Sequence, residues 1–570
     1  MDFRGALLKA GYIWVQPYVS RIIPEKFSSY KGIKFVKSYI TPLGEFKVLL
    51  IHYQKDLTKL PFAFVIEKPI ELTGISLPHI SNSGYLCYAN NDQAEWNPLD
   101  AEYFAKAIDN SIAKTLLVAT ENINESSEYQ NEFSNYWEGD STAYSFEEFP
   151  TATKNLRYSS LISKRGKNKR DSTEYVIFTE DENRNNWLKL REQATVIEDG
   201  TVVVVTVKRN NWAPVSSWPP SSLDEVVAWL ARADRSAHDF LIFQLVRFSA
   251  KRLLVILQIS EEGQLAFKLT FSKRYQSLLE QWRSRKKKSL KSMLAPICSP
   301  KATTSFIRLR VEAVDPNSIF LRNRPDPKVG DLRNKRIALV GCGTIGSFIA
   351  ELLVKSGAGA GARGRLEVYD PDILKSGNLG RHRLSARFLG WNKAEGITKL
   401  IEDDSLHKVS IYAHDEDFEI STDNLKKYDI LIDATGRVPV SLALAGFVRK
   451  MPSSRPILIH GFNHHWGQDS VAFIDNGKAC YGCLARFTTT KSKTETANTS
   501  RYSCGSLYTP YDASVSVVSA ALTVEAVLNT LEPKLKWTYT KVTSNIKQSQ
   551  KRLSLKPLSS CKVCGQGTIR

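Results

Sequence analysis

The feature that most constrains the fold is a glycine motif, G-x-G-x-x-G, formed by Gly341, Gly343 and Gly346. It follows the apolar run KRIALVG and precedes the helix-like segment SFIAELLVKSG. Glycines at this spacing allow a tight turn and a close approach of the backbone to phosphate, while the helix N-terminus presents free N–H groups. The motif therefore predicts a strand, a phosphate-binding turn and a helix that together form a nucleotide site.

The C-terminal half of the chain repeats this alternation of strand and helix. RLEVYDPD at 365–372, YDILIDATG at 428–436 and PILIHGF at 456–462 are further apolar runs of strand length. Strands that alternate with helices are typical of an open, doubly wound sheet. We therefore expect a Rossmann-like α/β domain at residues 306–570.

Polar side chains after the second predicted strand indicate which nucleotide binds. Asp370 ends that strand, and a carboxylate there suits a ribose hydroxyl. Up to this point an NAD-linked oxidoreductase fits equally well. Asn378, Arg381 and Lys393 follow, however. Two cations close to a phosphate loop suit a triphosphate, because charge gathers on the phosphates during adenylyl transfer.

These elements together resemble the ubiquitin-activating superfamily, which includes the ThiF/MoeB-like adenylyltransferases of the molybdopterin and thiamine pathways. The elements are the glycine motif, D-x-D at 370–372, N-L-x-R at 378–381 and G-x-x-K at 390–393. The resemblance implies that ATP binds here and that AMP is joined to the C-terminal carboxylate of a small β-grasp protein. It assigns the ribose to Asp370 and the phosphates to three polar residues, Asn378, Arg381 and Lys393.

One position departs from the pattern of that superfamily. Its members usually carry D-x-x-D after the fourth strand, and the second acid organises Mg²⁺. Here Asp433 retains the first acid and Gly436 replaces the second. Either Asp433 substitutes for the missing carboxylate or the Mg²⁺ site is altered.

Four of the eight cysteines form two C-x-x-C pairs, Cys480 with Cys483 and Cys561 with Cys564. Four thiolates at such spacing suit tetrahedral Zn²⁺, and in a reducing cytosol paired cysteines favour a metal over disulfides. We therefore predict a structural Zn²⁺ site, with redox-active thiols as the alternative. The resemblance implies the same closed site, which would tie the C-terminal tail to the core.

Cys504 lies in the polar stretch SRYSCGSLYTPYDAS, close to Arg501 and next to Gly505. A nearby cation favours the thiolate form of an exposed cysteine. In the resembled superfamily, a cysteine in the loop after the first zinc pair accepts the activated acyl group as a thioester. Cys504 is therefore the candidate for this role, and the alternative is an incidental loop cysteine.

A second candidate thiol, Cys87, lies in LPHISNSGYLCYANNDQAEWNPLD. The turn before the cysteine and the later Trp96-Asn97-Pro98 resemble the active-site segment of ubiquitin-conjugating enzymes. That family usually carries His-Pro-Asn before the cysteine, where this chain has Leu77-Pro78-His79. His79 therefore occupies the asparagine position. It either supports an oxyanion or a proton transfer, or it is a structural loop histidine.

An activating and a conjugating domain in one chain resemble the bacterial fusion enzymes of cyclic-oligonucleotide anti-phage (CBASS) operons. The resemblance implies that the substrate is the C-terminal tail of a cGAS-like nucleotidyltransferase, which is joined to a lysine-bearing target. The carboxylate would be adenylated at the glycine motif, taken by Cys504 as a thioester, and passed by Cys87 to the lysine. The resemblance also implies a homodimer through the adenylating domains.

Two further domains are expected before the adenylating domain. Residues 1–125 alternate short β-branched and aromatic runs with turns and then show a helical pattern, which predicts a ubiquitin-conjugating-like α+β domain. Residues 126–305 begin with a polar, acidic stretch and contain further strands and a helical stretch near 223–233. No chemistry attaches to this middle region, which we interpret as a mixed linker domain.

The formal net charge of +19 raises the alternative of a nucleic-acid-binding scaffold. The charge is concentrated at 163–170 and 283–291, in runs without interleaved aromatic residues, so we do not expect direct nucleic-acid binding. There is no membrane-length apolar run and no signal-peptide pattern, which predicts a cytoplasmic protein without membrane contact, and the resemblance implies that it is bacterial. A further alternative is a sulfur-carrier-type adenylyltransferase with a non-catalytic N-terminal domain.

Overall fold

The structure is a computed structural model of the 570-residue chain. The described residues are 2–15, 23–27, 30–53, 57–73, 75, 77–81, 83–89, 96–121, 137, 139, 141–149, 155–165, 170–191, 194–208, 218–248, 250–259, 263–286, 289–451, 455–464, 467–489, 500–503, 506–508, 511–543 and 551–565. The chain divides into two compact units, Met1–Arg184 with Gln193–Ala313, and Asn185–Glu192 with Val314–Arg570. None of the described helices is long and apolar enough to cross a membrane.

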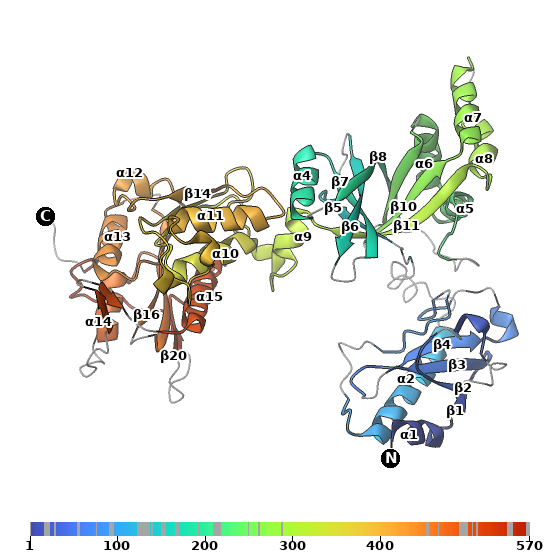
Figure 1. Cartoon of the computed structure of the whole chain (residues 1–570), viewed down its shortest axis with the longest axis horizontal. Helices are drawn as coiled ribbons and strands as arrows, with labels where there is room; N and C mark the ends of the chain where they lie inside the picture. Colours follow the sequence, from blue (N-terminus) through green and yellow to red (C-terminus); the bar gives the residue numbers. More distant parts are fainter. Residues whose placement is uncertain are drawn as a thin grey trace. The chain divides into compact units, whose positions relative to one another are not determined.

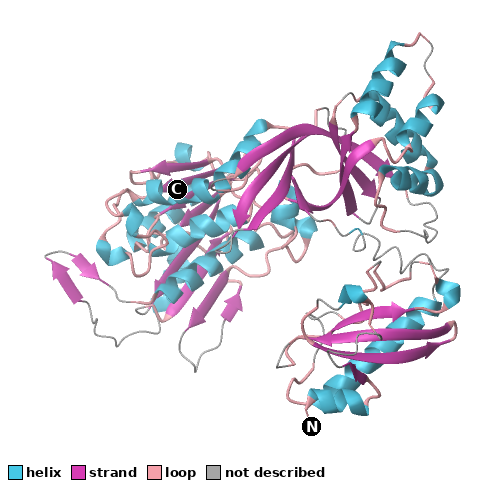
Figure 2. Cartoon of the chain, turned by 45° about the vertical axis from the view of Figure 1, so that its right-hand side comes forward, coloured by secondary structure: helices cyan, strands magenta, loops and turns pink. Residues whose placement is uncertain are grey.

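The first unit begins with an antiparallel sheet in the order β1–β2–β3–β4, with α2 behind it (Figure 2). Along α2, Phe104, Ile108 and Ile112 recur at every fourth position and are all buried, so one apolar stripe of the helix lies in the same core as Phe35 and Leu50 of the strands. The elements are α1 (Phe3–Lys9), β1 (Ile13–Val15), β2 (Ile33–Thr41), β3 (Gly44–His52), β4 (Phe62–Glu67) and α2 (Ala101–Glu121).

The middle of the chain forms a closed barrel in the order β10–β11–β5–β7–β6–β8–β9 (Figure 1). The helix predicted near 223–233 is α5. The strands are β5 (Ser141–Ser145), β6 (Arg157–Arg165), β7 (Arg170–Phe178), β8 (Thr195–Val207), β9 (Arg252–Ile259), β10 (Gly263–Phe271) and β11 (Thr303–Ala313). The helices are α4 (Asp181–Leu190), α5 (Leu223–Ala233), α6 (Arg235–Arg247), α7 (Lys273–Ser284) and α8 (Lys291–Ile297).

The second unit contains an eight-stranded sheet in the order β14–β13–β12–β15–β16–β17–β20–β21. The first five strands of this order are parallel and the last three pair antiparallel. β12 therefore lies between β13 and β15, where the strand order reverses, and ligands of doubly wound sheets bind beyond the carboxyl ends of strands at such a point. The strands are β12 (Arg336–Val340), β13 (Arg365–Tyr369), β14 (Ile411–His414), β15 (Ile430–Asp433), β16 (Ile457–His464), β17 (Asp469–Asp475), β20 (Tyr539–Thr543) and β21 (Lys551–Leu553).

Helices cover this sheet, and α10 starts directly at the glycine motif. The helices are α9 (Pro316–Leu321), α10 (Thr344–Lys355), α11 (Lys393–Asp404), α12 (Thr422–Leu425), α13 (Val438–Lys450), α14 (Tyr481–Thr489) and α15 (Ala513–Asn529). A separate two-stranded hairpin consists of β18 (Ser500–Ser503) and β19 (Ser506–Tyr508).

Helix α15 packs directly on β16 at a glycine. A Cβ atom added at Gly461 would lie 2.0 Å from Thr523 Oγ1 and 2.9 Å from Thr523 Cβ, far inside van der Waals contact. Thr523 is fully buried, and its hydroxyl donates to the carbonyl oxygen of Ser519 at 2.7 Å. Glycine at this strand position therefore allows the close approach of the helix.

Gly461→Ala should destabilise the second unit, because the added methyl group would overlap Thr523, and overpacking costs about 1–3 kcal/mol. In a Thr523→Ala background, which removes the nearest atom, the same substitution should cost less. Denaturant unfolding of the four proteins of this cycle measures both costs. Equal costs in the two backgrounds would contradict the assigned contact.

Candidate active site

The three motif glycines occupy positions with different steric demands. Gly341 has a φ of +92°, and a Cβ there would lie 2.9 Å from the backbone nitrogen of Thr435, at the end of β15. A Cβ at Gly346 would lie 1.9 Å from the carbonyl oxygen of Gly341, so α10 packs tightly against the turn. At Gly343 a Cβ would meet no atom of the described residues within 4 Å, apart from those of its chain neighbours. The face of the turn at Gly343 is therefore open to a ligand.

Asp370 fixes the shape of this turn from the end of β13. Its carboxylate accepts hydrogen bonds from the backbone N–H groups of Cys342 at 2.7 Å and Asp372 at 2.9 Å. Burial raises the pKa of Asp370, while Lys393 and the two N–H donors act in the opposite direction. A carboxylate that hydrogen bonds hold in place is ready to accept from a further hydroxyl group.

Lys393, the first residue of α11, reaches the same carboxylates. Its Nζ lies 2.7 Å from Asp372 Oδ2 and 3.9 Å from Asp370 Oδ1, and only 7% of the residue is exposed. The hydrogen bond from Lys393 lowers the pKa of Asp372. Asn392 caps α11 and donates to the carbonyl oxygen of Asp370 at 2.7 Å, so the predicted cation and the predicted acid are brought together.

Asn378 and Arg381 lie on the loop that follows β13. Asn378 Oδ1 accepts from the backbone N–H of Lys375 at 2.9 Å, and its carbonyl oxygen accepts from the N–H of Arg381 at 3.0 Å. The guanidinium carbon of Arg381 lies 4.2 Å from the ring centroid of Tyr511. The Tyr511 hydroxyl in turn shares a hydrogen bond of 2.6 Å with the hydroxyl of Thr344, the first residue of α10. No motif or spacing in the sequence indicates a role for Tyr511.

His382 is a second residue that the sequence did not single out. Its Nε2 lies 2.9 Å from the carbonyl oxygen of Cys342, and its Nδ1 accepts from the N–H of Leu384 at 3.1 Å. This arrangement requires the neutral tautomer with the proton on Nε2. Burial lowers the pKa of His382 to about 4. A hydrogen bond from the neutral His382 therefore connects the loop that carries Arg381 to the glycine turn.

Asp433 lies at the end of β15 and is only 2% exposed. Its Oδ1 accepts from the backbone N–H and hydroxyl of Thr435, and its Oδ2 accepts from Ser441 and from His460 Nδ1 at 2.9 Å. Burial alone would raise the pKa of Asp433, but the hydrogen bonds from His460 and Ser441 hold it below the usual range. Both oxygens already accept hydrogen bonds and Gly436 carries no carboxylate, so these residues do not fit a directly bound Mg²⁺.

The four paired cysteines form one cluster in which all sulfur atoms lie within 4.8 Å of one another. Cys480 Sγ is 3.5 Å from Cys561 Sγ, and Cys483 Sγ is 3.3 Å from Cys564 Sγ. Four sulfurs at about 2.3 Å from a central Zn²⁺ would be about 3.8 Å apart, so the cluster fits a tetrahedral ion. Leu558 also donates its N–H to Cys483 Sγ at 3.3 Å.

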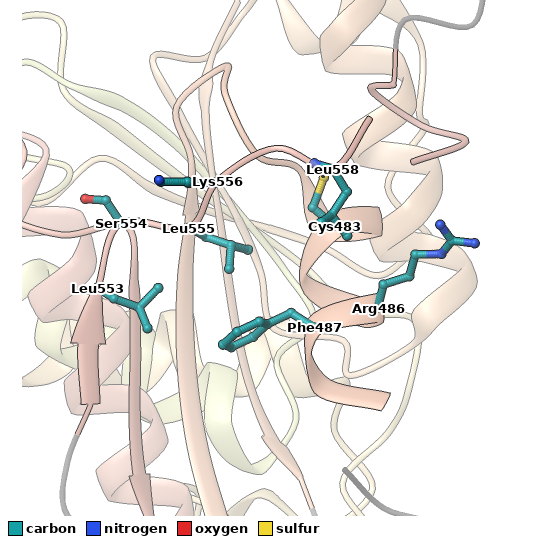
Figure 3. A pocket seen from close by; sticks show the side chains of 8 residues that line it. All are labelled: Cys483, Arg486, Phe487, Leu553, Ser554, Leu555, Lys556 and Leu558. Carbon is teal, nitrogen blue, oxygen red and sulfur yellow. Dashed lines mark hydrogen bonds between the residues drawn. The ribbon is translucent and has the colours of Figure 1, made fainter. Parts of the chain in front are cut away.

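A pocket of about 810 Å³ lies beside the cluster, between α14 and the segment after β21 (Figure 3). Its apolar lining includes Phe487, and Arg486 at its edge donates to the carbonyl and hydroxyl oxygens of Ser560 at 3.0 and 2.7 Å. None of the predicted nucleotide-site residues lines it. The lining residues are Cys483, Arg486, Phe487, Leu553, Ser554, Leu555, Lys556 and Leu558.

Cys87 and His79 lie together in the first unit. Cys87 is exposed, and its backbone N–H donates to the carbonyl oxygen of His79 at 2.9 Å. The intervening turn runs along β4, where Val65 donates to the carbonyl oxygen of Gly84 at 2.7 Å. His79 has a φ of +62°, which is rare for a residue with a side chain and marks a constrained loop.

Tyr85 lies close to Cys87, and the sequence did not single it out either. Burial raises the pKa of Tyr85, and the negative charge of the Cys87 thiolate raises it further. The tyrosine ring packs against Phe64 of β4 with a centroid distance of 5.7 Å.

Cys504 lies outside the described residues, as does its neighbour Gly505.

The pH dependence of stability should report on His382. Its folded pKa of about 4 lies below its ordinary value of 6.5, so the unfolded state binds a proton that the folded state does not. Stability should therefore fall as the pH decreases from about 6.5 towards about 4, by up to about 1.4 kcal/mol per pH unit. In His382→Gln this component should vanish. Unfolding measured across this range for both proteins tests it, and parallel profiles would contradict the assignment.

Metal analysis should detect about one Zn²⁺ per chain, because structural sites of this type bind Zn²⁺ tightly. Cys564→Ser removes one ligand and should lower both the zinc content and the unfolding temperature. Cys298→Ser is the matched control, because Cys298 is half-buried in the first unit and is not in the cluster. Zinc content that is unchanged in Cys564→Ser would rule out the cluster as the metal site.

Comparison with protein families matches two regions of the chain. Residues 317–563 match the ThiF family, and residues 16–146 match the prokaryotic E2 family B. Among solved structures, MccB of E. coli with ATP aligns with a TM-score of 0.31 and 19% identity, over 42% of this chain and 69% of that chain.

Two curated relatives align over nearly the whole chain, and both are described as ATP-dependent ubiquitin transferase-like protein Cap2. The protein of Vibrio cholerae is 34% identical over 93% of this chain and 94% of its own length. The protein of Escherichia coli is 32% identical over 98% of each chain. This chain therefore belongs to the family of ATP-dependent ubiquitin transferase-like Cap2 proteins.

Proposed function

We propose that the chain adenylates the C-terminal carboxylate of a partner protein and passes the acyl group through Cys504 and Cys87 to an amine of a target protein. One observation carries the first step: the open face of the glycine turn at Gly343 lies where Asp370 and Lys393 converge. An uncovered backbone turn next to the Asp370 carboxylate and the Lys393 ammonium group suits a nucleoside triphosphate.

In the adenylation step, an oxygen of the partner's carboxylate attacks the α-phosphorus of ATP, and the bond to the β-phosphate breaks. An acyl adenylate and pyrophosphate result. Arg381 and Lys393 stabilise the negative charge that collects on the leaving pyrophosphate, Asn378 contacts the phosphates and Asp370 accepts from the ribose. Asp433 holds the end of β15 in place through its hydrogen bonds to Ser441 and His460.

Mg²⁺ would accompany ATP, coordinated by the phosphate oxygens, and no step in this proposal depends on an ion bound directly by the protein. In the transfer steps, the Cys504 thiolate attacks the acyl carbon and AMP leaves. The Cys87 thiolate then attacks this thioester and restores the Cys504 thiol. A lysine amine attacks the second thioester, an amide forms, and the Cys87 thiol is released.

The partner is a cGAS-like nucleotidyltransferase that presents its C-terminal tail, and the acceptor is a lysine-bearing target. The description of the relatives as ubiquitin transferase-like supports a protein substrate.

We assign the conjugating step to domain 1–125, the adenylating step to domain 306–570, and a linking role to 126–305. The adenylating domains form a homodimer. Free thiols need a reducing compartment, which favours the bacterial cytoplasm.

Intact-mass spectrometry tests the relay. The full chain is incubated with ATP, Mg²⁺ and the candidate nucleotidyltransferase, with and without reductant. The wild type should form an adduct of the partner's mass less one water, and a thiol reductant should remove it because thiols cleave thioesters. Cys504→Ala should lose the adducts at both cysteines, whereas Cys87→Ala should retain the adduct at Cys504.

Cys298→Ala is the matched control, because this cysteine has no role in the relay and should leave both adducts intact. AMP formation with an adduct at Cys504 but never at Cys87 would contradict the conjugating step. That result would support the alternative function, a sulfur-carrier-type adenylyltransferase whose N-terminal domain is not catalytic.

A further inference from the structure

Tyr511 joins three segments that are far apart in the sequence. Its hydroxyl meets Thr344 at the start of α10, and its ring lies against the Arg381 guanidinium. On a third side, a Cβ added at Gly467 would lie only 2.5 Å from the Cβ of Tyr511. Gly467 has a φ of +80° and lies between β16 and β17. The backbone around Tyr511 is therefore shaped to admit this side chain beside the glycine turn.

The geometry of a stacked guanidinium explains what this contact does to Arg381. An aromatic ring occupies one face of the planar group and leaves the in-plane N–H groups able to bind a phosphate in a bidentate manner. Stacking also restricts a side chain that otherwise samples many rotamers. The ring therefore orients the cation before the ligand arrives, and the hydrogen bond to Thr344 holds the ring in place.

We propose that Tyr511 is a positioning residue that aims Arg381 at the β- and γ-phosphates of ATP. This proposal rests on the proposed function, in which Arg381 holds the pyrophosphate portion of the nucleotide. Tyr511 also lies seven residues after Cys504 in the sequence.

Nucleotide binding by the full chain distinguishes positioning from a merely structural role. AMP lacks the two phosphates that Arg381 contacts, so calorimetric titrations with ATP and with AMP give separate readouts. Tyr511→Leu should weaken ATP binding by about tenfold and leave AMP binding unchanged, because only the aim of Arg381 is lost. Tyr511→Phe keeps the ring and should recover most of the ATP affinity.

A double-mutant cycle assigns the effect to Arg381. In an Arg381→Ala background, Tyr511→Leu should cause no further loss of ATP affinity, since the group that it positions is gone. Tyr412→Leu is the matched control, because it removes another arginine–tyrosine contact of the same unit, that of Arg365 at 5.1 Å, at a residue that is 47% exposed. ATP binding by this control should equal that of the wild type.

Equal losses for ATP and AMP, additive losses in the cycle, or normal ATP binding by Tyr511→Leu would each overturn this proposal. Retained AMP binding also serves as the test that a variant is folded. A wild-type chain that binds no ATP would instead contradict the proposed function itself, so the two failures are distinguishable.

Discussion

The hydrogen bond from the Cys342 backbone N–H to the Asp370 carboxylate is the contact on which the geometry of the nucleotide loop depends. It joins the turn after β12 to the end of the neighbouring strand β13. The carbonyl oxygen of the same residue accepts from His382, so both peptide groups that flank the Cys342 side chain are fixed. The loop is therefore shaped before a nucleotide arrives, which avoids the entropic cost of ordering it on binding.

The cysteine cluster stabilises the same unit at a different place. It joins the start of α14 to the C-terminal tail, and Cys480 and Cys561 are 81 positions apart in the sequence. A metal ion held by the four cysteines would close a long segment and would restrict the unfolded chain strongly. The sequence between the two cysteine pairs contains Cys504, Tyr511 and helix α15, and we assign the first thioester to this part of the chain.

The sequence was sufficient for features that depend on local pattern. The glycine motif with its strand and helix, the alternation after Lys335 and the pairing of the four cysteines all have short-range signals. The closed barrel was not predictable, because strands such as β5 and β11 pair in parallel across a long separation. Local periodicity indicates that a strand exists but not which partner it chooses.

Within the candidate site, the sequence identified the residues whose types suit phosphate and ribose, but it did not indicate the long-range contacts that hold the site together. Tyr511 meets Thr344 across 167 positions, and His460 meets Asp433 across 27. Such pairs arise only from tertiary packing. The departure at Gly436 was visible in the sequence, but the burial of Asp433 among hydrogen-bond donors was not. The roles of Cys504 and of the conjugating segment stay predictions.

The most direct test of the central claim is to identify the products of ATP when the chain turns over with the candidate nucleotidyltransferase and Mg²⁺. Phosphorus NMR distinguishes cleavage at the α-phosphorus from cleavage at the γ-phosphorus. The proposed adenylation predicts AMP and pyrophosphate in equal amounts, with no turnover when the partner lacks its C-terminal tail. ADP and inorganic phosphate, or turnover that does not depend on the tail, would contradict it.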